Sequence, residues 1–169
     1  GSRGLGDVYK RQSHSNGYSL VRKVFDITKE SLNTHYDELG TTLGEALLTP
    51  TKLYVKPVLE LISKVDVKGL SHVTGGGFIE NIPRMMPEGT KVNIEEGTWE
   101  ILPIFKLLEE KGNVARMSMY NTFNMGIGMV AAVAKEDAEK AVEILEAMGE
   151  KAYIIGNVTK GEGIDIKLK

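Results

Sequence analysis

The segment SHVTGGGFIENIPRMMP, residues 71–87, contains three successive glycines between two apolar runs. Before the glycines the chain reads as a short buried strand, and after them it reads as a helix closed by proline. Glycine loses more conformational freedom on folding than any other residue, so three in a row indicate positive φ angles or a backbone that another group approaches closely. The segment therefore predicts a strand, a glycine turn and a helix start.

This order of elements is a geometry that binds phosphate. The first N–H groups of a helix have no partner within the helix, the helix dipole is positive at that end, and glycine lets an anion reach the backbone. The segment is not a Walker loop, because no Gly-Lys-Ser/Thr follows the glycines. Two interpretations stay open from the residues alone: Gly75, Gly76 and Gly77 either surround a phosphate or form a tight turn with no ligand.

Composition bounds the class of protein. The chain has 169 residues, a formal net charge of -2 and no cysteine, which fits one ordinary domain that needs no disulfide or metal to fold. Acidic and basic residues are mixed along the chain, so nothing indicates a nucleic-acid or membrane partner. The longest apolar runs are too short to span a bilayer. We expect a soluble cytoplasmic protein.

Hydrophobic periodicity predicts interleaved helices and strands, and therefore an α/β domain. Proline at the start of residues 103–112 and glycine at their end follow the asymmetry of helix termini, and glycine should lie just past the helix. Helices are expected within residues 16–32, 42–50, 54–65, 103–112 and 136–149, with strands within 69–74, 90–96, 125–134, 152–158 and 163–168. On the third helix, the inward residues should be Tyr54, Val58, Leu59, Ile62 and Val65.

Polar residues suggest further candidates near the predicted turns. His14, Ser15 and Asn16 precede the first helix, where they either bind a polar ligand or cap the helix. His72, within the apolar strand, is expected to be a core histidine with satisfied hydrogen bonds. The methionines are expected to fill the core.

The amides and charges that follow these turns allow two roles each. Asn121 and Asn124 lie in NTFNMGIGMVA, where they form a polar site or cap a turn. The glycines of that segment do not make a dinucleotide fingerprint, because the apolar run comes after them. Glu80, Asn81 and Arg84 follow the three glycines within about one helical turn, and they either face the same ligand or form a solvated helix face.

Four segments taken together resemble a known family. HSNGYSLVRKV, LLTPTKLYVKPVLELI, VTGGGFIENIPRMMP and YNTFNMGIGMV, in this order, are similar to the C-terminal domain of aminoimidazole ribonucleotide synthetases, also called phosphoribosylformylglycinamidine cyclo-ligases. The resemblance runs from His14 to about the end of the chain. It implies an α/β (α+β) fold, a three-layer α/β/α domain built on a mixed β-sheet, and a place in de novo purine synthesis.

The first residues and the resemblance together indicate domain boundaries. Residues 1–12, GSRGLGDVYKRQ, look like a non-native leader formed by a tag scar and adapter-derived sequence, so residues 13–169 should be the domain. Family members carry an N-terminal half of comparable size that supplies most of the ATP and Mg²⁺ site and the main homodimer contact. We therefore expect an isolated half whose partners are that missing N-terminal domain and the substrate, and which is inactive alone.

Family chemistry converts formylglycinamidine ribonucleotide and ATP to aminoimidazole ribonucleotide, ADP and phosphate. The resemblance implies that the glycine turn holds the 5′-phosphate of the substrate and that His14 has a catalytic role, with no metal ligand in this half. The remaining expected substrate contacts are Ser15, Asn16, Asn81 and Asn124. The alternatives are a non-catalytic ligand-binding or assembly module of the same fold and half of a related enzyme such as formylglycinamidine ribonucleotide synthetase.

Overall fold

The computed structural model describes residues 20–48, 54–74 and 76–169, and these fall into two compact units. The first, here called the loop unit, comprises the described parts of residues 1–52, 73–81 and 101–128. The second, here called the sheet unit, comprises the described parts of residues 53–72, 82–100 and 129–169. The chain therefore enters each unit more than once.

The loop unit is mostly helical. Its core contains the fully buried side chains of Leu43, Phe78, Met119 and Tyr120. A short hairpin turns at Gly40, whose φ is +68°, and pairs two strands in antiparallel register. The elements of this unit are α2 (Lys29–Leu32), β1 (His35–Tyr36), β2 (Thr41–Thr42), α3 (Leu43–Leu48), α6 (Pro103–Gly112) and α7 (Arg116–Thr122), and the helix α5 (Gly77–Arg84) begins here and ends in residues of the sheet unit.

The long helix expected over residues 16–32 is interrupted. Residues 20–24 are helical, but the chain leaves the helix at Phe25 and a new one begins at Lys29. Thr28 and Ser31 cause the restart, since the Ser31 N–H donates to Thr28 Oγ1 at 3.0 Å and the Thr28 N–H donates to Ser31 Oγ at 2.8 Å. This reciprocal capping box satisfies the first donors of a new helix. The prediction of one continuous helix was wrong for this reason.

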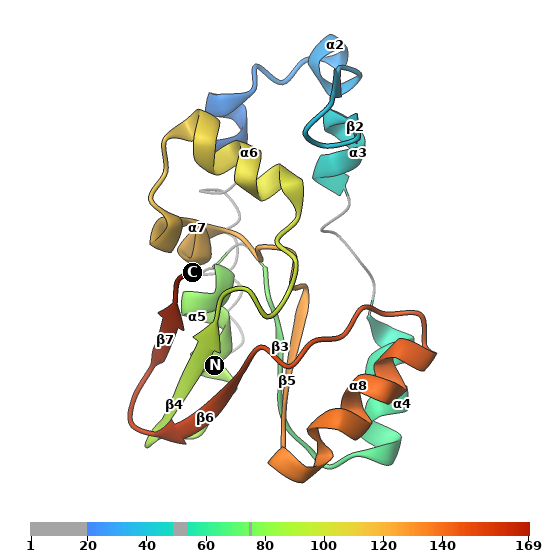
Figure 1. Cartoon of the computed structure of the whole chain (residues 1–169), viewed down its shortest axis with the longest axis vertical. Helices are drawn as coiled ribbons and strands as arrows, with labels where there is room; N and C mark the ends of the chain where they lie inside the picture. The colour runs from blue at the N-terminus through green and yellow to red at the C-terminus, as the bar shows by residue number, and fades with distance from the viewer. Residues whose placement is uncertain (1–19, 49–53, 75) are drawn as a thin grey trace, which may run out of the picture. The chain divides into compact units, whose positions relative to one another are not determined.

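The sheet unit contains two separate sheets. β3 pairs antiparallel with β5, whereas β4 lies between β6, which is antiparallel to it, and β7, which is parallel (Figure 1). The α/β class with a mixed sheet that the sequence predicted is therefore confirmed. The elements of this unit are α4 (Val55–Lys64), β3 (Val67–His72), β4 (Thr90–Glu95), β5 (Met129–Val133), the 3-10 turn η1 (Lys135–Asp137), α8 (Ala138–Ala147), β6 (Gly156–Lys160) and β7 (Ile164–Lys167).

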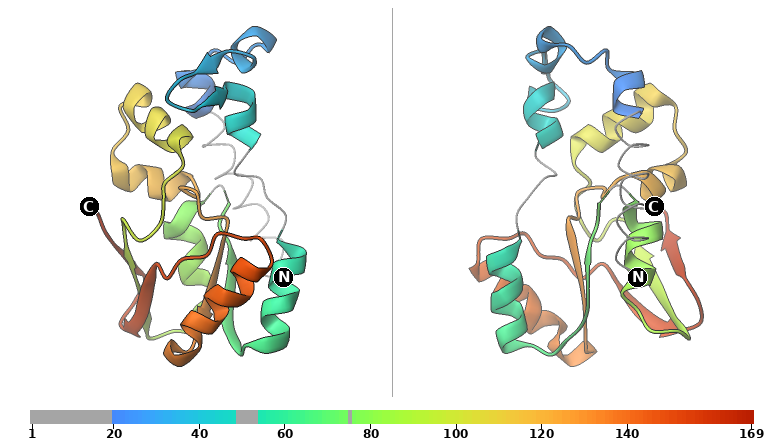
Figure 2. Two further views of the ribbon diagram at one scale, coloured as in Figure 1. Left: turned by 45° about the vertical axis from the view of Figure 1, so that its right-hand side comes forward. Right: turned by 180° about the vertical axis from the view of Figure 1, so that it is seen from behind.

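Helices α4 and α8 pack together beside the β3–β5 pair, as Figures 1 and 2 show. Leu61, Val65 and Ala141 form the buried cluster between them. Leu59 and Ile62, expected to point inward, are instead 61% and 50% exposed. The prediction was confirmed for Val65, which is buried, and was wrong for Leu59 and Ile62, because the apolar arc of α4 is wider than the face that α8 covers.

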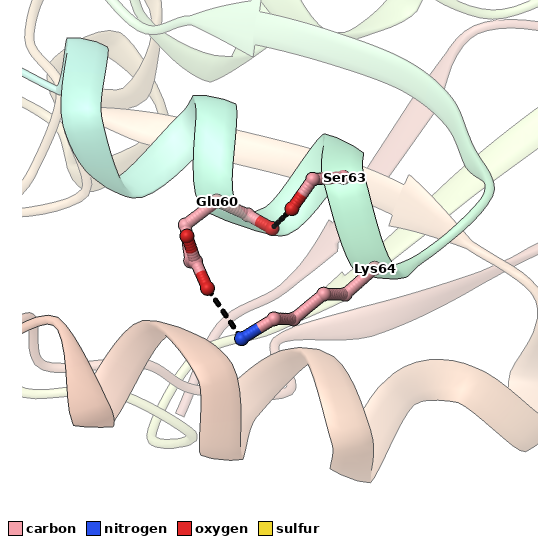
Figure 3. Close-up of polar contacts among 3 residues, drawn as sticks. All are labelled: Glu60, Ser63 and Lys64. Carbon is pink, nitrogen blue, oxygen red and sulfur yellow. Dashed lines mark hydrogen bonds and ion pairs between the residues drawn. The ribbon is translucent and has the colours of Figure 1, made fainter.

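The polar side of α4 carries an ion pair within the helix. Lys64 Nζ contacts the Glu60 carboxylate one turn earlier, and Ser63 Oγ donates to the Glu60 carbonyl oxygen at 2.7 Å (Figure 3). Both groups of the ion pair are solvent-accessible, so the pair contributes little to stability, about 0.3–0.5 kcal/mol. The helix is held by its packed side rather than by this pair.

Candidate functional site

The candidate site lies in the loop unit, at the glycine turn, a name used here for residues 74–77. The Val73 N–H donates to the Gly128 carbonyl oxygen at 2.9 Å, so the chain entering the turn is paired with the chain that leaves residues 121–128. The Gly77 N–H donates back to the Thr74 carbonyl oxygen at 2.9 Å and closes the turn. α5 begins at Gly77, as the sequence predicted.

Asn81 connects the helix to the turn. Its Oδ1 accepts a hydrogen bond from the Thr74 N–H at 2.9 Å, and its side chain is buried. The sequence places Asn81 about one helical turn after the glycines. In the structure, its side-chain oxygen accepts one hydrogen bond from the backbone of the turn. Asn81 therefore fixes the position of the turn against α5, and a contact between Asn81 and a ligand stays a prediction.

Gly77 is required by the fold itself. Its φ is +63°, a backbone conformation that residues other than glycine rarely adopt. A Cβ at this position would collide with the Tyr120 carbonyl oxygen and lie 2.9 Å from the Phe123 carbonyl oxygen. Since both neighbours are backbone atoms, they have little freedom to move. The absence of a side chain at Gly77 thus has a structural explanation without any ligand.

Gly76 has a different environment. It is buried, and a Cβ there would collide with the Glu80 carboxylate, which is the far end of a flexible side chain. No backbone atom is among its nearest neighbours. The added Cβ would also lie 2.9 Å from Glu80 Cβ, which cannot move without α5, so packing against α5 is part of the reason for glycine at this position. Gly75 lies outside the described residues.

Thr74 carries a signal that the sequence analysis did not use. Among the buried side-chain nitrogen and oxygen atoms of the described residues, the Thr74 hydroxyl oxygen is the one without a hydrogen-bond partner. Buried polar atoms nearly always have partners, and leaving one unpaired costs about 1–3 kcal/mol. The threonine directly before the glycines could have been named from its position alone, but its burial becomes visible only in the structure.

A second turn, here called the asparagine turn (residues 124–128), lies against the first. Asn124 Oδ1 accepts from the Gly126 N–H at 2.9 Å, and the Ile127 N–H donates to the Asn124 carbonyl oxygen at 2.9 Å. The buried Met125 has a φ of +55°. Asparagine stabilises such turns by bonding to its own backbone two residues on. The Oδ1 of Asn124 therefore caps the turn. A contact between Asn124 and a ligand stays a prediction.

The other predicted candidates divide between described and undescribed residues. His14, Ser15 and Asn16 lie outside the described residues. His72, expected in the core, is exposed, with its ring 6.2 Å from that of Tyr54. It is the last residue of β3 and alternates away from the buried Ser71, so the core prediction was wrong. The methionine prediction holds for Met119 and Met125, which are buried, and is wrong for the exposed Met117 and Met148.

Among the described residues, no group of three or more His, Cys, Asp or Glu side chains is placed to hold a metal ion. None of the helices that the structure describes is long and apolar enough to cross a membrane.

The sequence matches, over residues 4–169, the family described as "AIR synthase related protein, C-terminal domain". The chain belongs to this family. The resemblance to the C-terminal domain of aminoimidazole ribonucleotide synthetases is thereby confirmed. The match to the family begins within the expected leader, and the boundary at residue 13 stays a prediction.

Several relatives within the family are named phosphoribosylformylglycinamidine cyclo-ligase. The relative from Lachnospira eligens is 57% identical over 150 residues, which cover 88% of this chain and 44% of that protein. The relative from Bacillus cereus strain G9842 is 59% identical over 152 residues, which cover 89% of this chain and 44% of that protein. The relative from Acetivibrio thermocellus is 56% identical over 154 residues, which cover 90% of this chain and 45% of that protein. The chain thus spans less than half the length of these relatives.

Proposed function

We propose that this chain is the C-terminal half of an ATP-dependent cyclo-ligase that converts formylglycinamidine ribonucleotide to aminoimidazole ribonucleotide in de novo purine biosynthesis. The names of relatives that are 56–59% identical over almost nine-tenths of the chain support this activity. The enzyme uses ATP and Mg²⁺, held mostly by an N-terminal half, and acts in the cytoplasm as a homodimer. The C-terminal half alone is inactive.

The observation that carries the assignment of a phosphate site is the unpaired Thr74 hydroxyl just before the start of α5. A helix start favours an anion, and a hydroxyl can donate to a phosphate oxygen. We infer that this turn binds the 5′-phosphate of the ribonucleotide. Gly75, Gly76 and Gly77 surround the phosphate in this proposal, and the expected polar contacts to the rest of the ribonucleotide are Ser15, Asn16, Asn81 and Asn124, with His14 in the catalytic role.

The reaction explains why such a binding half is needed. ATP phosphorylates the formamide oxygen, so that phosphate can leave when a substrate nitrogen attacks the same carbon and closes the imidazole ring. Reactions of this kind depend on positioning and on stabilisation of developing charge. Anchoring the 5′-phosphate at one end of the substrate fixes the reacting atoms at the other end.

The first test is isothermal titration of this chain with formylglycinamidine ribonucleotide and, separately, with ATP and Mg²⁺. We expect the ribonucleotide to bind and Thr74→Val to weaken it about tenfold, the effect of losing one hydrogen bond to a charged group. Thr98→Val is the matched control, because the exposed Thr98 hydroxyl donates only to the nearby Glu95 carbonyl oxygen at 2.7 Å.

The second test joins the chain to the N-terminal half of the Bacillus cereus relative and measures turnover. Gly76→Val should raise the KM for the ribonucleotide while the protein stays folded. An unchanged KM would show that the phosphate of the ribonucleotide does not contact Gly76. Failure of both the chain and the joined enzyme to bind the ribonucleotide would contradict the proposed function as a whole.

A further inference from the structure

The helix α4 carries an exposed apolar stripe, here called the α4 stripe, which consists of Val55, Leu59 and Ile62. These side chains are 67%, 61% and 50% exposed. Their spacing of four and then three residues puts them next to one another on one side of the helix. Single exposed apolar residues are normal on protein surfaces, whereas a continuous group of them is typical of an interaction surface. The α4 stripe therefore indicates a surface that a partner covers.

The charges of α4 lie beside the stripe or at its ends. Glu60 and Lys64 form their ion pair on another side of the helix, because their positions are turned away from the stripe. The exposed Lys56 follows Val55 at the N-terminal end of the stripe. At the other end, the exposed Asp66 lies two residues past the end of α4. The stripe is thus apolar along its length, with a positive charge at its start and a negative charge at its end.

A hollow lies beside the C-terminal end of the stripe. Its volume is about 270 Å³, and it is lined by Ile62, Val65, Asp66, Val67, Gly69 and Leu70. A cavity of about 150 Å³ already holds a benzene molecule, so the hollow has room for an aliphatic side chain. Val55, at the opposite end, is the most exposed residue of the stripe. The surface therefore has a projecting apolar side chain at one end and a hollow at the other.

We propose that a second copy of this chain covers the α4 stripe, with the two α4 helices antiparallel about a two-fold axis near Leu59. Val55 and Ile62 are separated by about 10 Å along the helix, and Leu59 lies near the midpoint between them. Such an axis places Val55 of each copy beside the hollow of the other copy. A two-fold dimer requires a surface that is complementary to itself in this way. The inference is independent of the proposed function, because it needs no ligand.

The charges at the two ends favour the same orientation. Antiparallel helices place Lys56 of one copy at the end where the other copy has Asp66. The Asp66 carboxylate also pairs with Lys68 at 2.5 Å, but its two oxygens can accept from a second cation. Parallel helices would instead place like charges together. Because these side chains are exposed, they select the orientation and contribute little to the affinity.

Sedimentation of the wild-type chain at increasing concentration tests the proposal. One stripe and one hollow on each copy make a small interface, so we expect a dissociation constant on the order of 100 µM. Leu59→Glu places two like charges near the axis and should weaken the dimer at least about tenfold. Val158→Glu is the matched control and should leave the dimer unchanged, since Val158 is 43% exposed and lies on β6, away from α4 (Figure 2).

Reversal of the end charges tests the orientation. Lys56→Glu and Asp66→Lys should each weaken the dimer about fivefold, and the two substitutions together should restore it. The two residues lie at opposite ends of α4 within one copy, so the restored affinity would require contact between copies. Weakening by each single substitution without recovery in the double variant would contradict the antiparallel arrangement.

A unique thiol tests the position of the axis. The chain has no cysteine, so Leu59→Cys introduces a single reactive position. Under mild oxidation it should give a disulfide-linked dimer, because the axis brings the two thiols together. Val158→Cys should stay largely monomeric under the same conditions. Equal crosslinking of the two variants would show that random collisions, and not the proposed dimer, bring the thiols together.

Three further results would overturn the proposal. The first is a chain that stays monomeric up to about 1 mM, well above the expected dissociation constant. The second is self-association that Leu59→Glu leaves unchanged, which would place the contact on another surface. The third concerns a different occupant of the α4 stripe. If the N-terminal half of the Bacillus cereus relative binds this chain, dissociates the dimer and loses its binding in Leu59→Glu, that half covers the stripe.

Discussion

The glycine turn and the asparagine turn are neighbours in the loop unit, but they treat their polar groups differently. The asparagine turn pairs its groups internally, through Asn124 Oδ1 with the Gly126 N–H and through the Asn124 carbonyl with the Ile127 N–H. The glycine turn leaves the Thr74 hydroxyl buried and unpaired and has a carboxylate over Gly76. Unmet hydrogen bonds, rather than glycine content, distinguish a candidate ligand site from a structural turn.

The largest effect is expected at Gly77. Gly77→Ala should cost about 3 kcal/mol or more in the free energy of unfolding, because the new Cβ adds a collision with the Tyr120 carbonyl to the cost of a positive φ. Gly40→Ala is a matched control, since Gly40 has a similar φ of +68° with nothing within 4 Å of an added Cβ. It should cost about 1–2 kcal/mol. Equal costs in urea denaturation would show that the collision is unimportant.

Asn81→Ala is expected to have the next largest effect. The substitution leaves the Thr74 N–H without its acceptor in a buried position, which should lower the free energy of unfolding by about 2 kcal/mol. Asn81→Asp keeps an acceptor oxygen and should cost less. Urea denaturation of the two variants measures the difference. If both lose the same stability, the bond to Thr74 is not what holds the turn.

Asn124 tests whether the asparagine turn is only structural. Asn124→Ala should cost about 1 kcal/mol, because this hydrogen bond is partly accessible to water. Asn124→Asp keeps the acceptor for the Gly126 N–H and should keep the stability. If Asn124 contacts the ribonucleotide, as proposed, Asn124→Asp should still weaken ribonucleotide binding in calorimetry, since it replaces a donor with a charge. Unchanged affinity would limit the asparagine turn to a structural role.

Much of the fold was predictable from local sequence signals. Pro103 begins α6 as expected, and Gly76 lies between β3 and the start of α5 at Gly77. The two strands of the β1–β2 hairpin were not predicted, because two residues are too few to show a strand period. The aperiodic helix α7 was not predicted, because it packs through Tyr120 against Phe78, far along the chain. Gly112 was expected beyond the end of α6, yet it is the last helical residue and Asn113 takes the left-handed conformation at φ +48°. Asparagine tolerates the left-handed conformation, so Asn113 can end the helix in the way that was expected of Gly112.

The candidate site was predictable in place but not in detail. The order of strand, glycines and helix located the turn, since backbone donors and the helix dipole depend on local sequence alone. The burial of the Thr74 hydroxyl and the position of the Glu80 side chain depend on tertiary packing. The same limit applied to α4, where the pattern predicted the helix and packing against α8 decided which apolar arc is buried.

The expected change in stability at Thr74 is as small as that at Asn124, and its sign is informative. Thr74→Val replaces an unpaired buried hydroxyl with a methyl group of the same shape, so the ligand-free chain should become more stable by about 1 kcal/mol. Thr74→Ser keeps the hydroxyl and loses a methyl group, so it should be less stable. If Thr74→Val instead destabilises the chain in urea denaturation, the hydroxyl has an internal role. A stabilising substitution that weakens ribonucleotide binding would show that the hydroxyl serves the ligand at the expense of the fold.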